Sequence, residues 1–213
     1  MNTELVTNLL KRTVAFFLGL FIVQVGVSIF LCMNIGSDPF TLFTQGVSRV
    51  LHVSPGMANR ILTFLLLVLV LSIDKKEISI GTILAMICAG NFLDFSLGIL
   101  TPLLSFATTL PLKIFFYLIG CITIAIGFPI LKCADYGVAP NDSVYFVMVE
   151  KLKKPYGIIR MALDCVYMVL GFLFGGIIGL GTIISIFLTG PIMQVFMDKM
   201  NPYLYSFLHK QVN

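Results

Sequence analysis

Two short stretches interrupt the chain at equivalent places. The first is GSDPFT at residues 36–41 and the second is GVAPNDS at residues 137–143. In each, a glycine follows one apolar run and a proline three residues later begins the next, which is typical of one helix ending and another starting. Because the second glycine follows the first by 101 residues, we predict an internal repeat, with halves at about residues 12–100 and 112–200.

Other turn residues repeat at the same interval. At a shift of 101 the matching pairs are Gly19 and Gly120, Gly26 and Gly127, and Cys32 and Cys133. After one gap the shift becomes 100, and Gly81-Thr82 then falls on Gly181-Thr182 and Gly90 on Gly190. Matching glycines are more informative than matching leucines, since apolar residues coincide by chance in any strongly apolar sequence. Each half is therefore predicted to be a long helix, a break, a short helix and two further long helices.

The composition places these helices in a lipid bilayer. Of 213 residues, 58% are hydrophobic and only 11% are charged. A soluble domain carries about a quarter charged residues, so this chain cannot cover a surface that faces water. The net charge of +4 is better explained by basic loops than by a phosphate-binding face, so we expect no nucleic-acid partner. The five cysteines are odd in number and show no C-x-x-C spacing, which favours free thiols.

Six stretches come close to the roughly 20 apolar residues that a membrane-spanning helix needs. They are residues 13–33, 57–73, 80–100, 112–131, 157–175 and 182–200. Two shorter stretches, residues 38–53 and 140–153, carry several polar side chains and would be only about 21–24 Å long as helices. We therefore predict an all-α polytopic helical bundle, one transmembrane domain over residues 1–213, with six full spans and two short re-entrant or half-spanning helices. The alternative is eight spans.

The distribution of basic residues favours inverted halves. Both topologies place eleven of the fourteen lysines and arginines on the cytoplasmic side, so the total does not discriminate. Equivalent loops do differ: the loop after the first short helix holds Arg49 and Arg60, whereas its counterpart holds Lys151, Lys153, Lys154 and Arg160. The next loop reverses this bias, with Lys75-Lys76 in the first half and no basic residue at 175–181. Inverted repeats require such opposite bias, and we predict that both termini are cytoplasmic.

The two breaks hold the first candidate ligand-binding residues. They are Asp38, Thr41, Asn141, Asp142 and Ser143. Each short helix begins with unpaired backbone N–H groups and a partial positive charge, and a pair of such helix starts can contact a solute in the membrane centre. The alternative for Asp38 is a local role as the N-cap of the short helix.

Three further candidates lie inside apolar segments, where ionisable residues are costly and often functional. Asn91 and Asp94 are three residues apart and share a helix face, so Asp94 is either a buried proton or cation site or an interfacial carboxylate. Asp164 follows Arg160 by four residues, which fits a local ion pair or a solute or proton contact. The Gly190-Pro191 step predicts a kink in the last span.

The sequence offers no catalytic, metal or cofactor site. It has two histidines without an H-E-x-x-H spacing, no G-x-S-x-G elbow and no phosphate-binding lysine loop. An intramembrane carboxylate dyad of Asp94 and Asp164 is the one enzymatic alternative, and nothing in the sequence brings the two together. We therefore expect a protein that is not an enzyme.

The pattern of glycine, proline and polar residues along the chain resembles that of the YczE/YyaS/YitT group of bacterial integral membrane proteins. The likeness covers about residues 16–200 and rests on residues 36–41, 45–48, 81–82, 91–94 and 137–143. It implies a multi-pass protein of the bacterial cytoplasmic membrane, and no catalytic or ligand residue follows from it.

The duplicated halves and paired breaks favour a secondary transporter or exporter of an unknown small solute. A non-transporting membrane subunit is the alternative, with the basic stretch at residues 151–160 as a docking surface. A third alternative is the substrate-binding component of a larger energy-coupled transporter. A homodimer and a membrane-complex partner both remain open.

Overall fold

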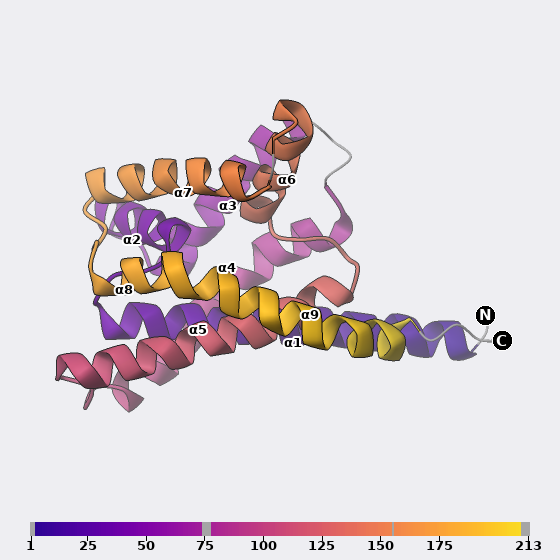
Figure 1. Cartoon of the computed structure of the whole chain (residues 1–213), viewed down its shortest axis with the longest axis horizontal. Helices are drawn as coiled ribbons and strands as arrows, with labels where there is room; N and C mark the ends of the chain where they lie inside the picture. Colours follow the sequence, from indigo (N-terminus) through magenta and orange to yellow (C-terminus); the bar gives the residue numbers. More distant parts are fainter. Residues whose placement is uncertain (1–2, 74–77, 155, 210–213) are drawn as a thin grey trace.

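The computed structural model describes residues 3–73, 78–154 and 156–209, and every regular element in these ranges is a helix (Figure 1). The elements are α1 (Thr3–Met33), α2 (Pro39–Leu51), α3 (Pro55–Ile73), α4 (Ile80–Leu103), α5 (Leu110–Cys133), α6 (Pro140–Leu152), α7 (Tyr156–Leu173), α8 (Leu180–Ile184), the π-helical turn η2 (Ser185–Thr189) and α9 (Gly190–Leu208). The prediction of an all-α fold is confirmed.

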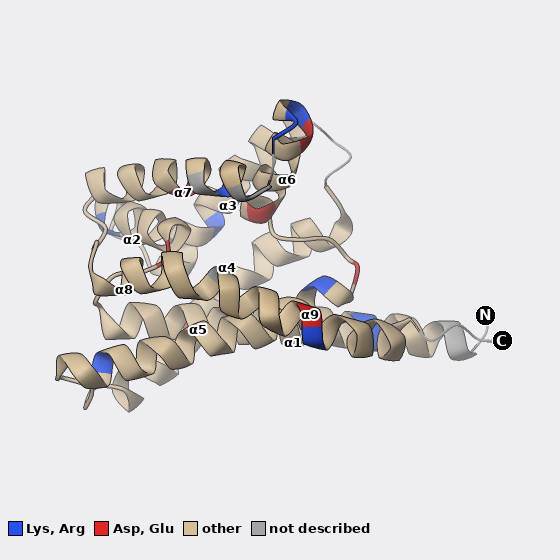
Figure 2. Cartoon of the chain, in the orientation of Figure 1, with Lys and Arg blue, Asp and Glu red and all other residues tan. Residues whose placement is uncertain are grey.

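Among the described residues, five helical segments are long and apolar enough to cross a membrane. They are Val6–Met33, Pro55–Ile73, Ile80–Leu103, Leu110–Cys133 and Leu180–Leu208. The predicted span at residues 157–175 forms α7, which carries Arg160 and Asp164 and is not among these five. Charged residues occupy only a few places on the ribbon (Figure 2). The chain is a membrane protein with several apolar helices.

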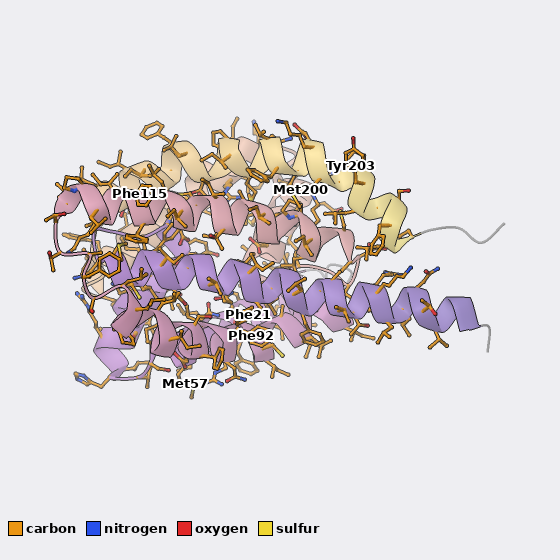
Figure 3. All side chains as sticks on the ribbon, turned by 90° about the horizontal axis from the view of Figure 1, so that it is seen from below. Phe21, Met57, Phe92, Phe115, Met200 and Tyr203 are labelled. Atoms are coloured by element: carbon orange, nitrogen blue, oxygen red, sulfur yellow. The ribbon has the colours of Figure 1, made fainter. Side chains whose placement is uncertain are left out.

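Large apolar side chains cover the outside of the helices. Figure 3 shows α9, α5 and α1 side by side with α5 in the middle, and the side chains project outward along their length. Phe115 and Tyr203, both labelled there, are mostly exposed. Phe21 and Phe92 instead pack edge to face, with ring centroids 5.5 Å apart, and join α1 to α4. An apolar exterior of this kind is expected where the solvent is lipid rather than water.

α1 and α5 cross as antiparallel helices through four glycines. Gly26 lies against Gly120, and Gly19 lies against Gly127. A Cβ atom added to Gly26 would come within 2.8 Å of the Gly120 carbonyl oxygen, so the two backbones are as close as small residues allow. Because residues with higher numbers on α1 contact residues with lower numbers on α5, the two helices run in opposite directions. The same register continues to the stacked rings of Phe30 and Tyr117 and to the hydrogen bond from Arg12 Nε to the Ala134 carbonyl oxygen.

Both predicted breaks are present with the same backbone geometry. Gly36 has φ 112° and Gly137 has φ 104°, a left-handed conformation that favours glycine. The residues two positions earlier, Asn34 and Asp135, have φ values of 53° and 56°. Asp38 is the N-cap of α2 and its Oδ1 accepts a hydrogen bond from the Thr41 amide at 3.2 Å. The chain therefore turns sharply before α2 and before α6.

Each break is held by a helix from the other half of the chain. The Gly81 amide at the start of α4 donates to the Tyr136 carbonyl oxygen at 3.0 Å, beside the second break. The Gly181 amide at the start of α8 donates to the Ile35 carbonyl oxygen at 2.8 Å, beside the first break. Segments about 100 residues apart thus make corresponding contacts across the molecule.

α2 begins inside the molecule and ends at its edge. Its first turn contacts α7, with the rings of Phe40 and Tyr167 5.5 Å apart, and its last turn meets the end of α7, where Arg49 Nη1 donates to the Gly175 carbonyl oxygen at 2.6 Å. α2 therefore runs parallel to α7 and ends at the same end of the molecule as α1 (Figure 1). The two termini lie together at the opposite end (Figure 1).

A π-helical turn interrupts the last long segment at the predicted position. η2 covers Ser185–Thr189, directly before Gly190 and Pro191. Proline has no backbone N–H to donate to the preceding turn, so the regular hydrogen-bond ladder cannot continue through it. Such π turns are frequent at functional sites, and this one borders the cavity described below.

Candidate functional site

A cavity of about 470 Å³ lies where the starts of α2 and α6 meet α7. Its size falls within the roughly 300–1,000 Å³ that is usual for small-molecule sites. Its polar lining is Gln24, Asp38, Thr41, Thr44, Asn59, Thr63, Asn141, Asp142, Tyr145, Arg160, Asp164, Ser185 and Thr189. Leucine, phenylalanine and methionine side chains form much of the remaining wall.

The two short helices point their N-termini at this cavity. Asp38 caps α2, and Asn141 and Asp142 occupy the first turn of α6. The unpaired N–H groups of a helix start carry about half a positive charge, so both carboxylates lie in a favourable field.

One ion pair is built into the wall. Arg160 Nε lies 3.6 Å from Asp164 Oδ2, and both side chains are partly exposed. The Tyr145 hydroxyl donates to Asp164 Oδ1 at 2.6 Å, and the Arg160 guanidinium lies over the Tyr145 ring at 5.4 Å. The predicted local ion pair is present, and it faces the cavity.

Other polar groups of the wall have no protein partner in the described ranges. Asp38 Oδ2 is fully buried and accepts no hydrogen bond from any described residue. The Asp142 carboxylate and the Asn59 amide group likewise make no side-chain hydrogen bond within residues 3–73, 78–154 and 156–209, although Asn59 is only 8% exposed. These side chains can therefore form hydrogen bonds with a molecule bound in the cavity.

Asn91 and Asp94 lie at another place. Asp94 accepts hydrogen bonds from the Gly56 amide at 2.8 Å and from the Ser54 hydroxyl at 2.6 Å, which caps the start of α3. Asn91 accepts a hydrogen bond from Arg60. Neither is among the described cavity-lining residues. Asp94 and Asp164 therefore have separate partners, and nothing in the described contacts links them as a dyad.

The structure thus gathers five of the eight candidate residues around one cavity. Asp38, Thr41, Asn141, Asp142 and Asp164 line it. Ser143, in the first turn of α6, is completely buried and is not among the described lining residues.

Sequence reasoning missed several neutral residues of the wall. Asn59, Thr63, Thr44 and Tyr145 are not conspicuous in an apolar sequence, but the shift of 101 would have found them. It relates Asn59 to Arg160, Thr63 to Asp164, Thr41 to Asp142 and Thr44 to Tyr145, and all eight residues line the cavity. The first half supplies neutral groups at these positions, whereas the second half supplies three charged groups and a phenol.

The polar side chains of the cavity can bind a molecule by charge and by hydrogen bonds. Within the described residues, no three His, Cys, Asp or Glu side chains come close enough to coordinate one. Its carboxylates are instead distributed over α2, α6 and α7.

Comparison with known proteins gives a family but no activity. The model of a family of unknown function, DUF6198, matches residues 10–198. An uncharacterized protein of Haemophilus influenzae is 26% identical over 92% of this chain and 88% of its own length. The uncharacterized protein YyaS of Bacillus subtilis is 25% identical over 89% of this chain and 94% of its own length. The uncharacterized membrane protein YczE of the same organism is 26% identical over 90% and 88%. No solved structure matches.

Proposed function

Since the chain belongs to the DUF6198 family of unknown function, its activity has to be argued from its own residues, and we propose that it is a secondary transporter or exporter of a small solute. The observation that carries this proposal is the cavity lined in pairs by residues 101 positions apart. A central site between two related halves, at the starts of broken helices, is the arrangement that alternating access uses.

The proposal includes an inverted repeat within one transmembrane domain. Its main support is the α1–α5 crossing. The shift of 101 carries Gly19 and Gly26 of α1 onto Gly120 and Gly127 of α5. Gly19 packs on Gly127 and Gly26 packs on Gly120, so the crossing is unchanged when the two halves are exchanged. Because α1 and α5 are antiparallel, equivalent helices would cross the membrane in opposite directions.

The proposed topology has six crossings. α2 starts at the cavity and ends beside the last turn of α7, at the end of the molecule where α1 ends, which supports a re-entrant helix. With α6 treated in the same way, α1, α3 and α4 cross in the first half, and α5, α7 and the α8–η2–α9 segment cross in the second.

We place the protein in the bacterial cytoplasmic membrane with both termini in the cytoplasm. The termini share one end of the molecule, and the exposed Lys151, Lys153 and Lys154 lie at the end of α6, on the side that this orientation makes cytoplasmic. Basic loops are retained on the cytoplasmic face.

Two-sided access to the cavity tests this function before any solute is known. A single cysteine at Asn141, in a chain whose native cysteines are replaced by serine, is labelled with a membrane-impermeant maleimide in right-side-out and inside-out vesicles. A transporter exposes this position to both sides over time, so both preparations should label. A cysteine at Leu51, at the end of α2, is the matched control and should label from one side only.

Labelling of Asn141→Cys in only one of the two vesicle preparations would show that the cavity opens to one side alone, which would contradict transport. That result would favour the non-transporting subunit, in which the cavity keeps one opening.

A further inference from the structure

We propose that the solute is a small organic cation with a single positive charge and that Asp142 is its main charged contact. This inference rests on the proposed transport function and names the class of its substrate. It follows from the charge of the cavity, from which groups are already paired, and from the shape and chemistry of the wall.

The cavity carries an excess of negative charge. Three carboxylates, those of Asp38, Asp142 and Asp164, face one guanidinium, that of Arg160. The starts of α2 and α6 each add about half a positive charge, which leaves close to one negative charge uncompensated. An uncompensated charge inside a membrane protein costs several kcal/mol. A monovalent cation in the cavity removes that cost, whereas an anion would increase it.

The three carboxylates are not equally available. Asp164 is engaged by Arg160 and by the Tyr145 hydroxyl. Asp38 uses one oxygen to cap α2, and its second oxygen is buried without a described partner. Asp142 lines the cavity and has no hydrogen bond to its carboxylate from the described residues. Asp142 is therefore the group that can approach a cation directly, with Asp38 Oδ2 as a second acceptor.

The wall suits an organic cation better than a bare metal ion. A volume of about 470 Å³ is far larger than one ion needs, and no three metal-ligating side chains converge in the described part of the chain. The rings of Phe30, Phe40 and Phe128 line the same space. Aromatic faces attract ammonium groups and pack against apolar substituents. The wall thus combines a carboxylate with an apolar, aromatic surface.

Two further polar groups can orient such a solute. Asn59 and Thr41 are 8% and 5% exposed, and both line the cavity. The Asn59 side chain makes no hydrogen bond to described residues, and the Thr41 hydroxyl lies beside the Asp38 carboxylate. Asn59 comes from α3 and Thr41 from α2, so both lie on the part of the wall that the first half of the chain supplies. A cation that also bears a hydroxyl or carbonyl group would satisfy them.

Three aromatic compounds of similar size that differ in charge test the proposal. Benzyltrimethylammonium is the cation, neopentylbenzene is its neutral isostere and benzenesulfonate is the anion. Binding to the purified full chain is measured by isothermal titration calorimetry, with the detergent alone subtracted. The cation should bind at least ten-fold more tightly than either of the others, and Asp142→Asn should weaken its binding at least ten-fold.

Asp198→Asn is the matched control, because Asp198 is exposed on α9 and hydrogen-bonds only to Gln194 among the described residues. It should leave binding unchanged. Equal affinity for the cation and its neutral isostere, or tighter binding of benzenesulfonate, would overturn the cation assignment on the unmodified protein, without any variant. Unchanged cation binding by a folded Asp142→Asn would overturn the role of Asp142.

The substrate class and the transport function fail in different ways. Binding of the cation with one-sided labelling of Asn141→Cys would support the cation site and contradict transport. Two-sided labelling with preferred binding of the anion would leave transport standing and overturn the cation class.

Discussion

Replacing Gly26 by alanine should destabilise the protein, because this glycine lies where the backbones of α1 and α5 come close together. The added Cβ would be 2.8 Å from the Gly120 carbonyl oxygen and 2.5 Å from Ile124 Cγ1. The isoleucine side chain can rotate away, but the carbonyl oxygen belongs to a helix backbone. Ordinary van der Waals contact begins at 3.4 Å, so the two helices must separate locally by about 0.6 Å, the difference between 3.4 and 2.8 Å.

The size of the effect follows from overpacking. Forcing an extra methyl group into a tightly packed contact costs about 1–3 kcal/mol. For a chain of this length each kcal/mol shifts the melting temperature by roughly 2–4 °C, so a decrease of about 2–12 °C is expected. Gly98→Ala is the matched control, since a Cβ added at Gly98 meets nothing within 4 Å. There the better helix propensity of alanine should leave stability unchanged or raise it by up to about 1 kcal/mol.

The native thiols supply the assay. Cys121 and Cys133 are buried on α5, whereas Cys165 is exposed and Cys32 and Cys88 are half-buried. With these last three replaced by serine in every protein compared, a thiol-reactive fluorophore reacts only when the helices separate on heating. Melting curves of Gly26→Ala, Gly98→Ala and the unmodified protein are compared in one detergent. If Gly26→Ala melts at or above the temperature of Gly98→Ala, the close α1–α5 crossing is wrong.

Two further substitutions test polar contacts in the same melting assay. Asp94→Ala removes the carboxylate that caps α3 and should lower stability by about 1–3 kcal/mol, whereas Asp198→Ala on the exposed face of α9 should not; equal melting temperatures would argue against the cap. Tyr145→Phe removes the hydrogen bond to the Asp164 carboxylate and should cost about 1.5–3 kcal/mol, with the exposed Tyr203→Phe as control; a neutral Tyr145→Phe would show that this bond contributes nothing.

Glycine and proline made much of the fold predictable. The breaks at Gly36 and Gly137 follow from residues whose backbone preferences are strong and local, and the long apolar runs follow from the thickness of the bilayer. The sequence predicted only a kink near Pro191 and not a π-helical turn. Proline removes one backbone hydrogen bond of the helix, and how the remaining bonds rearrange depends on the neighbouring helices.

The site was only partly predictable. The spacing placed Asp94 and Asn91 on one helix face, but it did not show which helix that face contacts. The hydrogen-bond partners of Asp94 lie at the start of α3, about 40 residues earlier in the chain. Asn59 and Thr63 are neutral and carry no signal of their own. A shift of 101 residues aligns Asn59 with Arg160 and Thr63 with Asp164, and all four line the cavity. Only an alignment of the two halves at every position would have identified Asn59 and Thr63.

The inverted arrangement of the two halves is the central claim, and the sidedness of two equivalent positions tests it most directly. Leu51 ends α2 and Leu152 ends α6; they are 101 residues apart and are 49% and 51% exposed. Single cysteines at these positions are labelled with an impermeant maleimide in intact cells and in inside-out vesicles. Inverted halves with three crossings each predict that Leu51→Cys reacts from outside and Leu152→Cys from the cytoplasm. Reaction of both from the same side would contradict the account, because only halves with an even number of crossings place equivalent positions on one face.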